Sequence, residues 1–109
     1  MGEDQQRQPT DQEVKEIERY LNEKHVERFG VFPEPYRGDR KGEASSIRSM
    51  LKHEGTEVTK TFIDECIKYY RPSPEYPTVN FKFMFLFMRR PFGLKNARKK
   101  VEKQQREAS

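Results

Sequence analysis

Apolar residues recur at spacings of three and four positions near the start of the chain, a period that predicts an amphipathic helix from about Asp11 to Phe29. Thr10 and Glu13 stand three residues apart, as in a capping box that begins a helix, and Gly30 is expected to end it. The polar residues 1–9 are expected to form a disordered lead, because they offer almost no apolar surface to bury. The stripe expected to face the core comprises Val14, Ile17, Tyr20, Leu21 and His25.

The middle of the chain predicts a loop followed by two helices. Residues 31–42 contain two prolines and two glycines and show no helical period, which is typical of a loop. A short helix is expected from Ala44 to His53, with Gly55 as its stop. Thr56 is expected to cap a longer helix that continues to Tyr70 and ends before a proline-rich connector. The apolar positions are Ile47, Met50 and Leu51 in the short helix and Val58, Phe62, Ile63, Cys66, Ile67 and Tyr70 in the longer one.

The stretch from Val79 to Met88 is open to two interpretations. Phenylalanines alternate at positions 81, 83, 85 and 87, which is typical of a strand, but the intervening positions after Lys82 are apolar too. No second strand is evident to pair with it, and an unpaired strand would leave open edges. We therefore expect a buried helix from Thr78 to Arg89, with Thr78 as its N-cap and a break at Pro91 and Gly93. The expected central cluster comprises Phe62, Ile63, Ile67, Phe83 and Leu86.

A basic segment follows this helix to the end of the chain. Residues 94–107 can form a helix with little to bury beyond Leu94, Ala97 and Val101. We therefore expect one helical domain over residues 10–94, followed by a basic helix or tail over residues 95–109 that adds little to the core. The predicted fold class is all-α, a small bundle of three to four helices.

Composition limits the size of this bundle and excludes some classes of protein. With 32% hydrophobic and 37% charged residues, the 109-residue chain can bury one small core. Its longest apolar stretch is far shorter than the roughly 20 residues that span a bilayer. A single cysteine cannot form an intrachain disulfide, and the chain begins without a basic and apolar leader, so a cytoplasmic protein is expected.

Charge is distributed unevenly along the chain. The formal net charge is +4, yet residues 1–35 hold nine acidic and five basic side chains. Residues 89–109 hold eight basic and two acidic side chains, a net charge of +6. A basic C-terminal segment beside an acidic first helix indicates either a polyanionic partner or screening of the tail by the acidic end.

Side chains with catalytic or metal-binding chemistry are few. His25 and His53 lie on different predicted helices, and neither has a second ligand at a metal-binding spacing. Both are expected near helix C-termini, where the helix dipole favours a histidine. Cys66 falls on the apolar face of its helix and is expected to be a buried, unreactive thiol. The sequence therefore predicts a protein that is not an enzyme and that holds no metal or cofactor.

Basic side chains remain as candidates for function. Rows of arginine and lysine at helical spacing can follow a phosphate backbone without reading its sequence. We therefore expect a nucleic-acid partner, DNA more than RNA. A tail that only solubilises the domain is the alternative, and a membrane surface is disfavoured because the tail lacks a bulky apolar face. The candidate phosphate contacts are Arg37, Arg40 and Lys41 in the loop, Arg48 and Lys52 in the short helix, and Arg89, Arg90, Lys95, Arg98, Lys99, Lys100 and Lys103 towards the C-terminus.

Aromatic residues on a sheet would offer a second kind of nucleic-acid contact, because single-stranded bases stack on aromatic rings. The four alternating phenylalanines are instead expected in the core, since the chain has too few other large apolar residues to build an interior.

The order of elements from Gly38 to Arg89 resembles a known type of module. A basic loop, a short helix ending in Met50-Leu51-Lys52, a helix carrying Phe62-Ile63-Asp64 and Tyr69-Tyr70, a proline-rich break and an aromatic helix follow one another. This order is similar to that of small helical modules in replication proteins of phages and Gram-positive bacteria, loosely the C-terminal region of DnaD-type initiators. The resemblance implies association with DNA and contact with replication machinery. The small size of the chain suits an accessory protein of a phage or mobile element.

Two functions of different classes remain open. The first is a non-enzymatic nucleic-acid-binding accessory protein of DNA replication or recombination, which contacts phosphates through the basic loop and the C-terminal segment. The second is a small protein-binding adaptor or inhibitor of a larger host or phage enzyme. That protein would engage its partner through the acidic first helix or through the loop around Phe32 and Tyr36. Exposed apolar residues on the folded domain would favour the second function.

Overall fold

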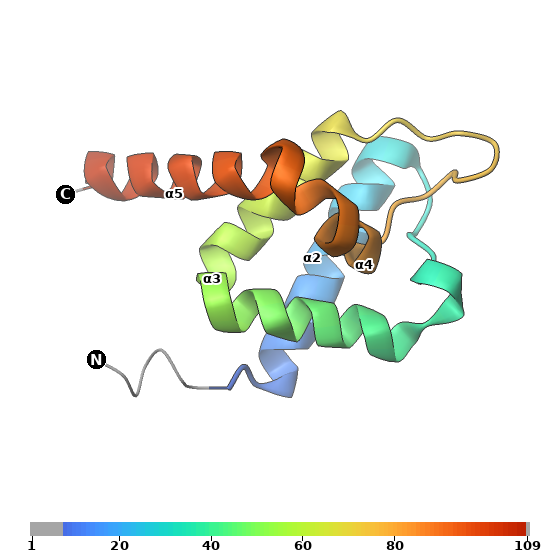
Figure 1. Cartoon of the computed structure of the whole chain (residues 1–109), viewed down its shortest axis with the longest axis horizontal. Helices are drawn as coiled ribbons and strands as arrows, with labels where there is room; N and C mark the ends of the chain where they lie inside the picture. The colour runs from blue at the N-terminus through green and yellow to red at the C-terminus, as the bar shows by residue number, and fades with distance from the viewer. Residues whose placement is uncertain (1–7, 109) are drawn as a thin grey trace.

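The chain folds into a small bundle of helices. The computed structural model describes residues 8–108, apart from the side chains at positions 36, 90–93 and 108, so most of the expected lead over residues 1–9 lies outside the described residues. All regular structure in the described residues is helical, which confirms the predicted all-α class. In chain order the elements are α2 (Asp11–Phe29), a short 3-10 turn η1 (Tyr36–Gly38), α3 (Arg40–Tyr69), α4 (Phe81–Phe83), a π-helical segment η2 (Met84–Gly93) and α5 (Leu94–Ala108) (Figure 1).

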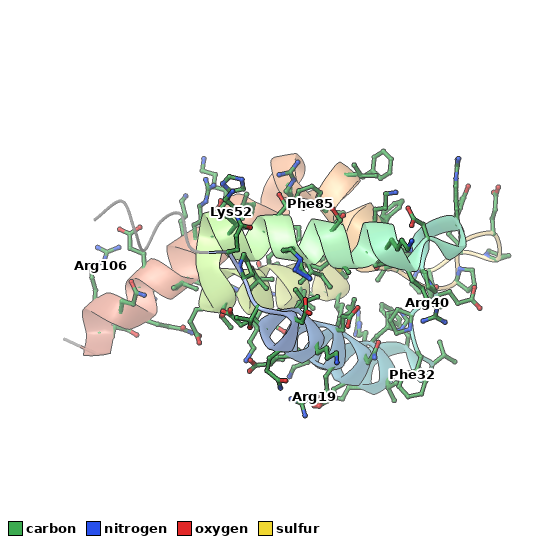
Figure 2. All side chains as sticks on the ribbon, turned by 90° about the horizontal axis from the view of Figure 1, so that it is seen from below. Arg19, Phe32, Arg40, Lys52, Phe85 and Arg106 are labelled. Carbon is green, nitrogen blue, oxygen red and sulfur yellow. The ribbon has the colours of Figure 1, made fainter. Side chains whose placement is uncertain are left out.

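The long helix α3 is the central element of the bundle. It contacts α2, α4, η2 and α5. Figure 2 shows α2 and the chain around Phe85 on opposite sides of the first half of α3. The acidic first helix and η2 therefore cover different faces of the first half of α3.

The first helix begins and ends as its sequence predicts. The Thr10 hydroxyl accepts a hydrogen bond from the Glu13 N–H (3.1 Å), and the Glu13 carboxylate accepts one from the Thr10 N–H (2.9 Å), so the capping box is complete. Gly30 has a left-handed backbone (φ 80°), a conformation that favours glycine, and its N–H donates to the Val26 carbonyl. The stripe that faces the core comprises Val14, Ile17, Leu21 and His25, with Tyr20 half-buried beside it.

Helix α3 consists of two halves joined at Gly55, where the sequence predicts a stop. Gly55 has φ 86° and ψ 172°, a conformation almost confined to glycine, so the helix turns there. The first half begins at Arg40, earlier than expected, because the Asp39 carboxylate accepts a hydrogen bond from the Gly42 N–H (2.8 Å) and caps it. The expectation that Arg40 and Lys41 lie in the loop is therefore wrong, since both lie in the first turn of α3.

The connector between α3 and α4 has no regular structure, as its prolines predict. The Tyr70 N–H donates to the Cys66 carbonyl and ends α3. The Tyr70 hydroxyl lies 2.6 Å from the Tyr76 carbonyl oxygen and 3.2 Å from that of Thr78. These contacts hold the connector against the end of α3.

The predicted helix break at Pro91 and Gly93 does not occur, because helical backbone continues from α4 through η2 into α5. Proline has no N–H for the usual bond to the fourth preceding carbonyl, and it would interrupt an α-helix. Within η2 the bonds reach one residue further back, as where the Leu94 N–H donates to the Arg89 carbonyl. This wider turn carries the chain past the proline. The N-cap of α4 is Asn80 rather than Thr78, because the Asn80 side chain accepts a hydrogen bond from the Phe83 N–H (2.8 Å).

The core gathers around the second half of α3. Phe62, Ile63 and Cys66 are fully buried, and Ile67 is nearly so. The Phe62 ring packs edge-on against Phe81, with ring centroids 6.1 Å apart. The predicted burial of Phe62, Ile63 and Ile67 is confirmed.

The inward face of η2 differs from the expected one. Met84 and Met88, four residues apart, are buried against the core. Leu86 lies midway between them and is 50% exposed, while Phe83 is only partly buried. The expectation that Leu86 is buried is therefore wrong, because the two methionines take the inward positions of the turn.

Helix α5 contributes more to the interior than its composition suggests. Ala97 is fully buried and Val101 is 6% exposed, and α5 packs along α3. The Lys100 ammonium lies 2.6 Å from the carboxylate of Glu65, a buried residue of α3. The expectation that the C-terminal segment adds little to the core is wrong, since a small alanine lets α5 approach α3 closely.

Candidate nucleic-acid interface

Two adjoining hollows lie where the first half of α3 meets η2 and the start of α5. Their volumes are about 330 Å³ and 350 Å³, and they share Arg89, Leu94 and Arg98, so they form one groove. We call this surface the basic groove. Its lining residues are Ser49, Met50, His53 and Glu54 of α3, Phe85 and Arg89 of η2, and Leu94, Lys95 and Arg98 of α5.

The basic groove combines an apolar floor with a cationic rim. Phe85 and Leu94 are half-buried and form the lower surface of the groove, above the buried Met50. Arg89, Lys95 and Arg98 are exposed, as is His53. Glu54 supplies the one carboxylate among the lining residues, which leaves an excess of positive charge.

Two contacts with Phe85 fix the side chain of Arg89. Its Nε donates a hydrogen bond to the Phe85 carbonyl (2.6 Å), and its Cζ lies 3.8 Å from the centroid of the Phe85 ring, a cation–π contact. Arg89 forms no ion pair with any of the described residues. The guanidinium is therefore oriented, and no carboxylate among the described residues neutralises its charge.

Arg98 joins α5 to the bend of α3. Its Nε lies 2.9 Å from Glu54 Oε1 and its Nη2 lies 2.5 Å from Oε2, a two-pronged ion pair. These hydrogen bonds raise the pKa of the Arg98 guanidinium. Because Glu54 balances this charge, Arg98 shapes the groove. Arg89 and Lys95, which form no ion pair within residues 8–108, supply its excess positive charge.

Three further candidate cations line neither hollow. Lys52 precedes the lining residue His53, but successive helix positions do not face each other, and Lys52 follows Arg48, which points to α2, by four residues. Lys99 and Lys103 follow Lys95 at steps of four residues, about 6 Å each along the axis of α5. Lys52, Lys99 and Lys103 are exposed and form no ion pair within residues 8–108.

The structure separates the remaining candidates from the groove. Arg37 lies in η1 and Arg40 and Lys41 begin α3, at the end of its first half opposite to Lys52 (Figure 2). The basic loop and the C-terminal segment therefore do not share one site. The side chain of Arg90 is outside the described residues.

Two candidate cations form ion pairs with other residues of the chain. Arg48 points to α2, where its Nη2 lies 2.8 Å from Asp11 Oδ1. Lys100 is held by Glu65 of α3. Carboxylates of α3, rather than the acidic first helix, therefore balance part of the C-terminal charge.

The sequence did not reveal Phe85 as a surface residue of the groove, because all four phenylalanines were assigned to the core. One signal could have found it. Phe85 and Arg89 are four residues apart, a spacing at which side chains of a helix meet.

Of the two histidines and the single cysteine of the chain, His53 lines the basic groove, and His25 and Cys66 do not. Cys66 is fully buried, and burial raises the pKa of its thiol, so the thiolate is disfavoured. Across the described part of the chain, no three histidine, cysteine or acidic side chains gather into a metal site. Within the same part, every helix is too short or too polar to cross a membrane.

No model of a known protein family, no curated protein and no solved structure matches the chain. The resemblance to DnaD-type modules therefore stays a prediction, and the function is argued from the basic groove itself.

Proposed function

We propose that the protein binds nucleic acid, without catalysing a reaction, by laying phosphates across the basic groove and the outer face of α5. The observation that supports this proposal is the convergence of cations from separate elements. Arg89 of η2 and Lys95 of α5 both line the groove, and neither forms an ion pair within residues 8–108. Several cations on one surface attract a polyanion and release its condensed counterions on binding.

The orientation of Arg89 favours phosphate as the group bound. An arginine presents N–H donors in a rigid fork that matches the oxygens of a phosphate. Contact with Phe85 fixes this fork before any ligand arrives, so less side-chain entropy is lost on binding.

Lysines along α5 extend the contact beyond the groove. Lys95, Lys99 and Lys103 are spaced by one helical turn, so a strand that leaves the groove meets further positive charge. Such contacts position a nucleic acid without reading its bases, so the expected sequence preference is weak. DNA is the expected polymer, and the replication setting comes from the resemblance of residues 38–89 alone.

Fluorescence anisotropy with short labelled DNA at two salt concentrations tests this proposal. Binding should be measurable at low salt and should weaken as salt rises, with a slope of log affinity against log salt that counts the phosphate contacts. Failure to bind either single-stranded or duplex DNA at low salt would contradict the proposal.

A second function, a protein-binding adaptor, is favoured by a different surface. Val31 and Phe32 follow α2 and are 51% and 68% exposed. Large exposed apolar residues often mark a protein interface. Figure 2 shows Phe32 and the groove residue Phe85 on opposite sides of α3, so this surface is separate from the basic groove. If the protein is an adaptor, a variant with Ser in place of Val31 and Phe32 should no longer recover, in a pull-down, the partner that the wild-type chain recovers. Its DNA binding should be unchanged.

A further inference from the structure

We infer that the basic groove holds an unpaired base, and that the nucleic acid bound is therefore single-stranded. This inference rests on the proposed function, because it names the class of nucleic acid that the same groove accepts. Three features of the groove support it: the cation–π pair of Phe85 and Arg89, the apolar floor, and the size of the hollow.

The first feature is a flat surface already in place. The Arg89 guanidinium lies over the Phe85 ring at 3.8 Å, and the bond from Arg89 Nε to the Phe85 carbonyl prevents it from turning away. Arg89 is exposed and lines both hollows, so it presents its planar group to the groove. Unpaired bases stack on arginine planes as well as on aromatic rings.

The second feature is the floor, which a phosphate alone would not use. Phe85 and Leu94, which are half-buried, offer apolar surface beneath the cationic rim. A phosphate stays hydrated at the rim, whereas burying the apolar face of a base away from water lowers the free energy. A groove with both surfaces suits a nucleotide whose base and phosphate are accessible together.

The third feature is size. A hollow of about 330 Å³ lies at the small end of the range of ligand sites, roughly 300–1,000 Å³. The bases of a duplex are paired and stacked, and they cannot enter such a hollow without being extruded at a cost. An unpaired base meets no such cost, so the groove discriminates in favour of a single strand.

Polar side chains at the rim can bond to a bound base without selecting one of the four bases. The Ser49 and His53 side chains line the same hollow and can bond to the edge of a base. Both groups can donate and accept hydrogen bonds. Stacking therefore decides the affinity, and the expected preference among bases is small.

The test compares a single strand, a duplex of the same length and a single strand with abasic sites, using the full chain and its Arg89→Lys variant. Lysine keeps the positive charge and loses the plane that stacks. The wild-type chain should prefer the intact single strand over both other ligands. Arg89→Lys should lower affinity for that strand about tenfold and leave the salt slope unchanged.

The matched variant Lys95→Gln separates charge from stacking. It should weaken binding of all three ligands and make the slope for a single strand shallower by about 0.7. Equal wild-type affinity for intact and abasic strands would overturn the inference, and so would unchanged single-strand affinity in a folded Arg89→Lys variant. Either result, with salt-dependent binding retained, would leave the proposed function standing. No binding of any ligand at low salt would remove both.

Discussion

The Nε2 atom of His25 accepts a hydrogen bond from the backbone N–H of Val79, 54 residues later in the chain, at 3.2 Å. The other ring nitrogen, Nδ1, lies 2.6 Å from the Val31 carbonyl oxygen, so it carries the proton and donates there. The ring is fully buried. A neutral histidine thus ties the end of α2 to the connector that precedes α4.

Stability should therefore decrease in mild acid. Burial lowers the pKa of His25, and the hydrogen bond to Val31 opposes this only in part. Because the folded-state pKa lies below the unfolded value of about 6.5, the stabilisation is complete above that value and is lost as pH falls through the folded pKa. Urea unfolding from about pH 7.5 to about pH 5 should show this loss.

The control for this experiment is the other histidine, which is exposed. His25→Gln should flatten the dependence of the unfolding free energy on pH, whereas His53→Gln should leave it as in the wild type. An equal pH dependence in the wild type and His25→Gln would show that another group is responsible.

Stability should depend on Ile63 and hardly at all on Leu86. Ile63 is fully buried and Leu86 is 50% exposed, although both were expected in the core. Ile63→Ala should lower the free energy of unfolding by about 2–5 kcal/mol, and Leu86→Ala by less than about 0.5 kcal/mol. Chemical denaturation of both variants measures the difference. A similar loss of unfolding free energy in both variants would mean that Leu86 packs against the core.

The bend of α3 should require glycine. At φ 86° and ψ 172°, Gly55 lies in a region almost closed to other residues, whereas Gly30, at φ 80° and ψ 0°, lies where asparagine is tolerated. Gly55→Asn should cost about 1–3 kcal/mol of stability, and Gly30→Asn should cost less than about 1 kcal/mol. Thermal unfolding ranks the stability of the two variants. A larger loss in Gly30→Asn than in Gly55→Asn would contradict the bend at Gly55.

Removing the charge of Lys100 should destabilise the fold, because Glu65 would remain buried without its partner. Lys100→Met should cost about 1–3 kcal/mol, whereas Lys99→Met, at an exposed position without an ion pair in residues 8–108, should be nearly neutral. Adding Glu65→Gln to Lys100→Met should recover part of the loss. If Lys100→Met is as stable as Lys99→Met, the ion pair does not anchor α5.

Features that depend on neighbouring residues could be predicted from the sequence. The capping box of Thr10 and Glu13 and the stop at Gly30 involve groups within one helical turn, so their pattern is visible in the sequence. The bend at Gly55 was found for the same reason.

Features that depend on distant contacts could not be predicted. Every position from Phe83 to Met88 is apolar, so no polar residue indicates which side of the helix faces outward, and Leu86 was misplaced. The π-helical turns that carry the chain past Pro91 have no recognised local signal. The ion pair of Arg98 with Glu54 joins residues 44 positions apart, so the groove that it shapes exists only in the folded chain.

The most direct test of the proposed site compares two triple variants of equal charge in the DNA-binding assay. One replaces Lys95, Lys99 and Lys103 of α5 with Gln, and the other replaces Lys15, Arg19 and Arg28, which are exposed on α2, with Gln. Each lowers the formal net charge from +4 to +1. The α5 variant should bind DNA more than tenfold more weakly at moderate salt, with a shallower salt slope, while the α2 variant stays within about twofold of the wild type. Equal loss in both variants would show that overall charge, rather than the proposed site, attracts the nucleic acid.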